Sequence, residues 1–261
     1  MTQDSTVSFG RDALYVNPLD QAASFSFDEQ VARVFPDMIK RSVPGYSQII
    51  GMLGVIARQH VKTGGRVYDL GASLGAATLS VGHQLQDSSV ELVAVDNAPA
   101  MVTRCREVLQ RELPAQPLSV IESDIRALDY KPCDLVILNF TLQFLPPEDR
   151  TPLLQKLYAA LKPGGALIVG EKIHFADEVQ QQWLYELHHD FKRANGYSDM
   201  EISQKRSAIE DVLRTDTADD HLKRLTDIGF IPVTQWFQYL NFAAFLAIKP
   251  SQNDGGVYAA T

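Results

Sequence analysis

The chain has 261 residues, of which 45% are hydrophobic and 21% are charged, so it can bury a sizeable core and is not a largely disordered chain. Its 24 Lys and Arg residues against 32 Asp and Glu residues give a net charge of −8, which argues against direct binding of nucleic acid. Two cysteines are too few for a disulfide framework or a zinc cluster, and no apolar run approaches the roughly 20 residues that span a bilayer, so we expect neither a bound metal nor a membrane segment.

The N-terminal part of the chain is expected to start with a flexible arm over residues 1–24 and to continue into two helices over residues 28–62. The first residues are polar and lack the pattern of a secretion signal, which favours a cytoplasmic protein. Pro36 is expected to interrupt the first helix, and Ser47 is the expected N-cap of the second. Both helices are expected to belong to a single domain that covers residues 25–250.

From residue 66 onward, short apolar strands alternate with helices. This spacing predicts an α/β domain with a parallel sheet and right-handed crossovers. The expected strands are RVYDL (66–70), ELVAVD (91–96), LSVIES (118–123), CDLVILNF (133–140) and ALIVGEK (166–172). The expected helices between them cover residues 75–85, 99–112 and 147–161.

The last part of the chain is expected to begin with a helical insert over about residues 177–214, broken at an asparagine–glycine pair. A helix over residues 218–228 follows, and then the strands PVTQWFQ and NFAAFLAIK. The connection between these two strands is too tight for a crossover, so they must form an antiparallel hairpin. Residues 251–261 are expected to be a flexible tail.

Small and polar residues follow the expected strands at their carboxyl ends, where open parallel sheets bind ligands. The run between Gly71 and Gly75 allows a ligand to approach the backbone, although it is also compatible with a plain tight turn. Asp96, next to Asn97, ends the second strand. Its carboxylate can accept hydrogen bonds from both ribose hydroxyls, or it can cap the next helix.

The third strand is followed by Asp124 and Ile125, whose carboxylate and amide can recognise an adenine edge, and the fourth strand ends in Asn139. This order of elements and strand-end residues resembles the class I S-adenosylmethionine-dependent methyltransferases. The resemblance implies a Rossmann-like fold with a seven-stranded, mostly parallel sheet and an antiparallel C-terminal hairpin. It also implies that the methionine part is held by Gly71, Ala72 and Ser73, the ribose by Asp96, and the adenine by Asp124 with Ile125.

Four longer segments are more specific. They cover residues 34–50, 69–80, 136–150 and 188–207, and they closely resemble the carboxy-S-adenosyl-L-methionine synthase family. The resemblance implies that S-adenosylmethionine is a substrate, which reacts with prephenate to give carboxy-S-adenosylmethionine and phenylpyruvate. It further implies a homodimer and a functional link to the downstream tRNA carboxymethyltransferase, which places an oxyacetyl group on wobble uridines.

Three side chains match ligand positions of that family. Arg206 matches the arginine that binds the new carboxylate, a task that suits the planar, permanently charged guanidinium. Tyr46 and Asn139 match positions that bind the methionine part. Without the resemblance, Arg206 would be a solvated helix residue, Tyr46 a packed aromatic residue and Asn139 a strand-end cap.

Two other functions remain open from the residues alone. One is an ordinary S-adenosylmethionine-dependent methyltransferase of a small molecule or RNA, which shares the nucleotide site. Against it, the proline pair at residues 146–147 comes too late after the fourth strand for an amino-group methyltransferase, and the basic clusters are short. The other is an inactive ligand-binding protein. The pair His188-His189 is expected to hold one structural and one exposed histidine, since adjacent helical residues point about 100° apart.

Overall fold

The computed structural model describes four stretches of the chain, which are residues 10–16, 26–85, 87–209 and 212–251. The side chains of residues 206–209 fall outside this description. Most of the predicted arm and tail also lies outside the described residues, so their flexibility stays a prediction, as does the single domain over residues 25–250. The described stretch of the arm contains Asp12, whose side chain is buried.

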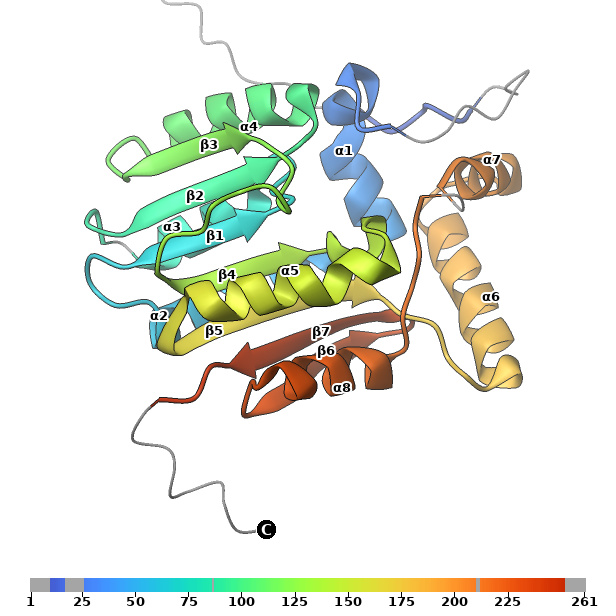
Figure 1. The fold of residues 1–261 in the computed structure, drawn as a ribbon. Helices are drawn as coiled ribbons and strands as arrows, with labels where there is room; N and C mark the ends of the chain where they lie inside the picture. Colours follow the sequence, from blue (N-terminus) through green and yellow to red (C-terminus); the bar gives the residue numbers. More distant parts are fainter. Residues whose placement is uncertain (1–9, 17–25, 86, 210–211, 252–261) are drawn as a thin grey trace, which may run out of the picture.

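Seven strands form one sheet in the order β3-β2-β1-β4-β5-β7-β6 (Figure 1). They are β1 (Arg66–Leu70), β2 (Glu91–Asp96), β3 (Leu118–Glu122), β4 (Cys133–Asn139), β5 (Leu161–Lys172), β6 (Val233–Tyr239) and β7 (Phe242–Ile248). The strands β1 to β5 run parallel, and β7 pairs antiparallel with both β5 and β6. The predicted sheet and its C-terminal hairpin are therefore confirmed.

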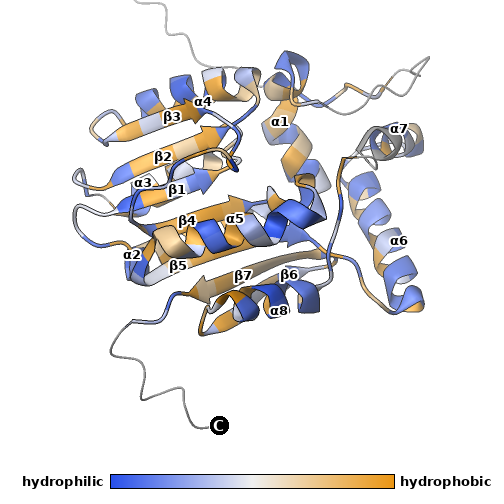
Figure 2. Cartoon of the chain, viewed as in Figure 1, coloured by the Kyte–Doolittle hydropathy of each residue, from blue (hydrophilic) through white to orange (hydrophobic). Residues whose placement is uncertain are grey.

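Helices cover both faces of this sheet. One face packs against α2 (Tyr46–His60), α3 (Ala76–Leu85) and α4 (Pro99–Glu112), and the other against α5 (Pro147–Ala160) and α8 (Ala218–Ile228). Along β4, Leu135 and Ile137 face the first group of helices, whereas Val136 and Leu138 face the second. This two-sided burial explains why the central strands are hydrophobic along their length (Figure 2). Each fully buried Leu or Ile side chain stabilises the fold by roughly 1.5–3 kcal/mol.

Three further helices lie beyond the carboxyl edge of the parallel strands (Figure 1). α1 (Glu29–Ser42) packs Met38 into a small apolar cluster with Leu74 of the loop after β1. α6 (Glu178–Ala194) and α7 (Asp199–Ile209) form the predicted insert. The helical structure is interrupted between them by a turn at the predicted asparagine–glycine pair. These helices give the carboxyl edge of the sheet a cover that the core fold alone would not provide.

Three local predictions were wrong. α1 continues through Pro36, because its apolar face stays buried despite the backbone hydrogen bond that a proline removes. α2 begins before Ser47, behind Gly45, whose φ of 75° makes the turn into the helix. β5 begins at Leu161 instead of residue 166, since Leu161 already pairs with Cys133 of β4 ahead of a shift in register.

Candidate active site

A cavity of about 410 Å³ lies at the carboxyl edge of the sheet, between the strand ends and residues of α1, α6 and α7. Nine of the ten predicted site residues line it, namely Tyr46, Gly71, Ala72, Ser73, Asp96, Asn97, Asp124, Ile125 and Asn139. The tenth, Arg206, belongs to α7, but its side chain lies outside the described residues. The structure thus brings the predicted residues together, while their roles stay predictions.

The loop after β1 is shaped to bring backbone close to a ligand. Gly71 has a φ of 75°, and its amide donates a 2.8 Å hydrogen bond to the carbonyl of Val95 on β2. A Cβ atom at this position would overlap the side chain of Thr141. Ser73 also has a positive φ, of 51°. Only a glycine satisfies both the backbone and the space that Thr141 leaves at residue 71, a requirement compatible with a plain turn and with a ligand-binding loop.

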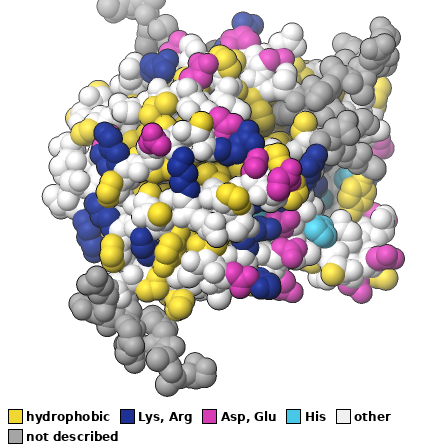
Figure 3. Space-filling view, viewed as in Figure 1, with side chains coloured by type: hydrophobic (Ala, Val, Ile, Leu, Met, Phe, Trp, Pro, Cys, Tyr) yellow, Lys and Arg dark blue, Asp and Glu magenta, His cyan; other side chains and the backbone are white. Residues whose placement is uncertain are grey.

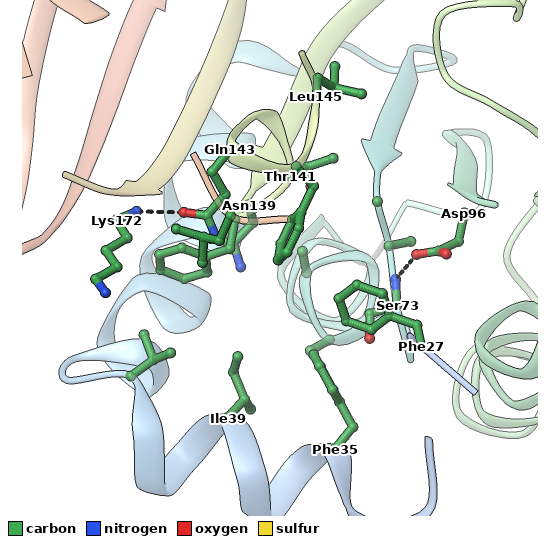
Figure 4. A pocket seen from close by; sticks show the side chains of 18 of the residues that line it. Phe27, Phe35, Ile39, Ser73, Asp96, Asn139, Thr141, Gln143, Leu145 and Lys172 are labelled. Carbon is green, nitrogen blue, oxygen red and sulfur yellow. Dashed lines mark hydrogen bonds between the residues drawn. The ribbon is translucent and has the colours of Figure 1, made fainter. Parts of the chain in front are cut away.

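Asp96 supports the same loop from the neighbouring strand. One carboxylate oxygen accepts a 2.8 Å hydrogen bond from the amide of Ser73 (Figure 4), and the other accepts one of 2.9 Å from the amide of Ala98. Burial raises the pKa of Asp96, and these backbone donors oppose that rise. The carboxylate therefore both positions the glycine loop and starts the turn into α4, so the helix-capping alternative and a ligand role are compatible.

The residues predicted to face adenine lie at the far end of the cavity. Both oxygens of Asp124 contact the guanidinium of Arg126, with distances of 2.5 to 3.0 Å. This contact lowers the pKa of Asp124 and keeps it ionised. The side chain of Ile125 is 6% exposed and packs into the core next to β3.

The two residues predicted to hold the methionine part sit near the middle of the cavity. The amide oxygen of Asn139 is buried and has no hydrogen-bond partner among the described residues. This oxygen lies over Gly170 of β5, where a Cβ atom would meet it, so any ligand contact of Asn139 would be made by the rest of its side chain. Tyr46 packs against the ring of Phe140, with 6.2 Å between the ring centres. Burial and the nearby charge of Asp69 raise the pKa of Tyr46, so its hydroxyl stays a proton donor.

Asp69 is a cavity residue that the sequence analysis did not select. It lies in β1 just before the glycine loop, and its carboxylate accepts hydrogen bonds from the amide (3.0 Å) and hydroxyl (2.6 Å) of Thr78. Burial raises the pKa of Asp69 from 3.8 to about 6. Its place at a strand end was the signal that could have identified it.

A buried glutamate fixes the segment that follows β4. The carboxylate of Glu171 accepts hydrogen bonds from the amides of Leu142 (2.8 Å) and Gln143 (3.0 Å), in the short helix η1 (Leu142–Phe144). Burial raises the pKa of Glu171 to about 8. The side chain of Gln143 accepts in turn a 2.9 Å hydrogen bond from the amide of Lys172 (Figure 4). This chain of contacts sets the position of the β5 end at the cavity.

The pair of histidines on α6 does not resemble a metal site. His188 is 3% exposed, and its Nε2 lies 2.8 Å from the carbonyl oxygen of Ser42. Burial and the charges of Lys192 and Lys172 lower the pKa of His188 well below its ordinary value, so it is the neutral structural histidine that we expected. His189 is half-buried against Tyr185 rather than exposed, which corrects the expectation for the second histidine.

Residues far apart in sequence tie α7 to the start of the chain. The ammonium of Lys205 lies 2.9 Å from the hydroxyl oxygen of Ser42 and 3.5 Å from the carboxylate of Asp12. The Tyr197 hydroxyl donates to the same carboxylate, and Arg41 donates to the Asp12 carbonyl oxygen at 3.2 Å. Burial lowers the pKa of Lys205 to about 8 despite the attraction of Asp12. This network positions the helix turn that carries Arg206.

Comparison with known proteins assigns the family. Residues 67–165 match the family described as "Methyltransferase domain". The carboxy-S-adenosyl-L-methionine synthase of Chromohalobacter salexigens is 57% identical over 239 residues, which cover 92% of this chain and 88% of that protein. The synthase of Photobacterium profundum is 54% identical over 240 residues, which cover 92% of this chain and 98% of that protein. The chain belongs to the carboxy-S-adenosyl-L-methionine synthase family.

Solved structures outside this synthase family share its fold. A putative O-methyltransferase from Nostoc punctiforme has a TM-score of 0.60 at 18% identity, covering 85% of this chain and 59% of that one. Human N-acetylserotonin methyltransferase in complex with S-adenosylmethionine has a TM-score of 0.55 at 16% identity, covering 85% and 56% of the two chains. At such identities the likeness shows the class I methyltransferase fold alone.

The described residues contain neither a membrane-spanning helix nor a metal-binding cluster. None of their helices is long and apolar enough to cross a membrane. The same stretches contain no group of three or more His, Cys, Asp or Glu side chains that could hold a metal ion. On the face seen in Figure 3, basic and acidic side chains are interspersed rather than separated into patches of one sign.

Proposed function

We propose that this member of the synthase family converts S-adenosylmethionine and prephenate into carboxy-S-adenosylmethionine, phenylpyruvate and water. The observation that carries the proposal is the cavity, which gathers nine predicted site residues at one sheet edge in a chain 57% identical to a named synthase. S-adenosylmethionine is a substrate in this reaction, not a methyl donor.

The described residues fit S-adenosylmethionine along the strand ends. Asp124 and Ile125 lie where the adenine would bind, and Asp96 where the ribose would bind. The methionine part would then lie along the loop at Gly71, where no Cβ fits. Asn139 lines the same part of the cavity and would contact this methionine part. Tyr46 donates to the methionine carboxylate, completing the amino-acid end of the site.

The reaction exchanges bonds without a separate oxidant or metal. The carbon–carbon bond to the ring carboxylate of prephenate breaks, and the ring hydroxyl leaves with one proton of the sulfonium methyl group as water. The methyl carbon forms a new bond to the released carboxyl carbon. Since water would quench the reacting carbon, the site has to be dry. Phe27, Phe35 and Phe144 line the cavity, and Phe27 packs edge-on against the other two rings, which excludes water from that wall.

The carboxylate on the product requires a cation, and we assign this role to Arg206 of α7. A guanidinium stays charged in a dry site and meets a carboxylate with two parallel hydrogen bonds. The network around Lys205 supports this assignment, because it anchors the adjacent turn of α7 with a buried ion pair. An arginine here would bind carboxy-S-adenosylmethionine in preference to S-adenosylmethionine.

The proposal extends to assembly and cellular context. α6 exposes 79% of Val179 and 61% of Trp183, an apolar strip that a second copy of the chain would cover. We therefore propose a homodimer. The family resemblance and the activated carboxymethyl group of the product support the tRNA carboxymethyltransferase of wobble uridines as the consumer of this product, with both enzymes in the cytoplasm.

Incubation of the purified protein with both substrates tests this function. Phenylpyruvate should accumulate with prephenate consumption, and mass spectrometry should find S-adenosylmethionine increased by one carboxyl group. A protein that instead forms S-adenosylhomocysteine and a methylated acceptor is an ordinary methyltransferase, and the proposal is then wrong.

A further inference from the structure

The strand ends that line the cavity carry aspartates toward β3 and a lysine on β5, and Arg126, which also lines the β3 end, pairs with Asp124. Across the carboxyl edge, in the spatial order β3, β2, β1, β4 and β5, the lining residues are Asp124, Asp96, Asp69, Asn139 and Lys172. Figure 4 shows Asp96 and Lys172 on opposite sides of Asn139. A cationic substrate and an anionic substrate would therefore be drawn to opposite ends, with the amide between them.

Two lysines define the basic end. Lys172 comes from the end of β5, where its backbone is held by Gln143, and Lys192 comes from α6. Both line the cavity and both are half-buried. His188 lines the cavity with them, and their charges lower its pKa. Lys205 also lines this end, and its buried ammonium contacts Ser42 and Asp12.

His188 between these lysines is neutral and its tautomer is fixed. A backbone carbonyl only accepts hydrogen bonds, so the Nε2 atom that lies 2.8 Å from the Ser42 oxygen carries the proton. Nδ1 is then an acceptor and adds no positive charge. The ring of Phe242 packs against His188 at 5.0 Å and against Phe140 at 5.9 Å, which gives this end an apolar wall.

The proposed reaction leaves one charge of prephenate unassigned. Prephenate has two carboxylates, and only the ring carboxylate is transferred; the other stays on the pyruvyl side chain and leaves with phenylpyruvate. The acidic residues that line the cavity in the described part of the chain are Asp69, Asp96 and Asp124, all at the opposite end. A second carboxylate placed there would be repelled.

We propose that Lys172 and Lys192 bind the carboxylate that prephenate keeps. The inference rests on the proposed function and assigns the second substrate to the basic end of the same cavity. The ring then lies against Phe140 and Phe242, and the carboxylate to be transferred points along the cavity toward Asn139 and the methyl group. Two cations suit this site better than one, because each lysine is a point charge that meets a single oxygen.

Replacement of each lysine by methionine tests the assignment, since methionine keeps the length of the side chain and removes the charge. In Lys192→Met and Lys172→Met we expect the KM for prephenate to rise roughly 10- to 100-fold, as for a lost charge-assisted contact. The Kd for S-adenosylmethionine should stay within about twofold, because its adenosine lies at the other end of the cavity and its methionine part is held by Tyr46, Asn139 and the loop at Gly71. This unchanged Kd also shows that the variants are folded.

Arg193→Met is the matched control. Arg193 follows Lys192 on α6, is exposed and pairs with Asp190 and Asp199, so its loss changes the net charge equally without touching the cavity. Its KM for prephenate should be that of the wild type.

Inhibition by phenylpyruvate separates the two carboxylate sites. Phenylpyruvate carries only the retained carboxylate, so its inhibition constant should rise in Lys192→Met by the same factor as the KM for prephenate. Unchanged values of both constants in both lysine variants would overturn the subsite while leaving the proposed function intact. Failure of the wild-type protein to form carboxy-S-adenosylmethionine contradicts the proposed function instead.

Discussion

At the scale of single residues, the shape of the cavity depends on positions where one additional carbon atom would overlap a neighbouring side chain. Gly71 combines a left-handed backbone with a Cα that faces Thr141, whose hydroxyl donates a 2.8 Å hydrogen bond to the carbonyl of Leu70. Asp69 places a buried carboxylate one step before this turn. Both residues shape the same part of the cavity. Gly71 leaves room for the Thr141 side chain, and Asp69 supplies a titratable carboxylate.

Gly71→Ala should weaken S-adenosylmethionine binding by roughly 10-fold or more and lower the free energy of unfolding by about 1–3 kcal/mol, because the added Cβ strains the backbone and displaces Thr141. Titration calorimetry and denaturant unfolding measure the two effects. Gly64→Ala is the control, since Gly64 has a similar φ of 68° but open space around it and lies away from the cavity. Equal losses of binding in both variants would contradict a specific role for Gly71.

The raised pKa of Asp69 predicts how S-adenosylmethionine binding depends on pH. Since the pKa is about 6, the carboxylate is protonated at pH 5 and ionised at pH 7, where it attracts the cationic substrate. Affinity should therefore increase roughly 3- to 10-fold from pH 5 to pH 7. Asp69→Asn should remove this increase in titration calorimetry, and a persistent increase would assign it to another group.

The same raised pKa of Asp69 makes the stability of the fold decrease with pH, whereas ligand affinity increases. Between about pH 4 and pH 6 the folded, ligand-free protein keeps a proton on Asp69 that the unfolded chain loses, so the free energy of unfolding falls as the pH rises through this window. The size of this contribution is roughly 3 kcal/mol. It should be visible as a pH-dependent difference between wild type and Asp69→Asn in denaturant unfolding.

At the scale of elements, the segment between α7 and α8 is held in place by buried charge. Asp216 pairs with Arg150 of α5 at 2.8 Å and with Arg224 of α8 at 2.8 Å, and Arg150 is 1% exposed. Arg150 also donates to the carbonyl oxygens of Leu145 and Arg214. The Asp216 carboxylate thus joins α5 to α8. Through Arg150 it also holds the segment after β4 that contains Leu145, on the side of the sheet opposite α2.

Asp216→Ala should lower the free energy of unfolding by about 3–5 kcal/mol, because it leaves the buried Arg150 without its counter-charge. Thermal and denaturant unfolding measure this loss. Lys223→Ala provides the comparison: it breaks an exposed ion pair with Asp227 on α8, and such pairs contribute about 0–1 kcal/mol. Similar losses in the two variants would mean that the Asp216 contacts are solvated.

The sequence predicted elements well where local pattern and tertiary packing agree. β2 and α4 have the predicted bounds, because an apolar strand and a proline-initiated helix are defined by their own residues. The start of β5 was missed, since the pairing of Leu161 with Cys133 depends on a strand 28 positions away in the chain. α1 passes through Pro36 for a similar reason, as packing outweighs the local signal.

The residues of the candidate site also divide into those that the sequence predicted and those that depend on tertiary packing. Asp96 and Asn139 were predictable, because the carboxyl ends of parallel strands meet at one edge whatever the details of packing. Lys192 and His188 were not, since they reach the cavity from α6, and nothing in the local pattern of a helix tells over which edge it will lie.

At the scale of the whole molecule, the apolar strip on α6 is the feature that a single chain does not explain. Val179 and Trp183 lie on adjacent turns of the same helix and are the two most exposed large apolar side chains of the described residues. Trp183→Glu should convert the proposed homodimer into monomers, because it buries a charge in the interface. Light scattering coupled to gel filtration measures the mass.

Val55→Glu is the control for this change, since Val55 is a 40% exposed residue on α2, away from α6. A dimer that persists in Trp183→Glu, or a wild-type protein that is already monomeric, contradicts the proposed assembly through α6.

The contact between Asp12 and Lys205 joins the N-terminal arm to α7 across 193 positions of sequence. A chain shortened to begin at residue 13 would leave that ammonium buried with one hydroxyl partner, and it would also remove the acceptor of the Tyr197 hydroxyl. The turn of α7 that carries Arg206 would then loosen, so removing a stretch that looks dispensable in sequence would first reduce the discrimination between the carboxylated nucleotide and its precursor.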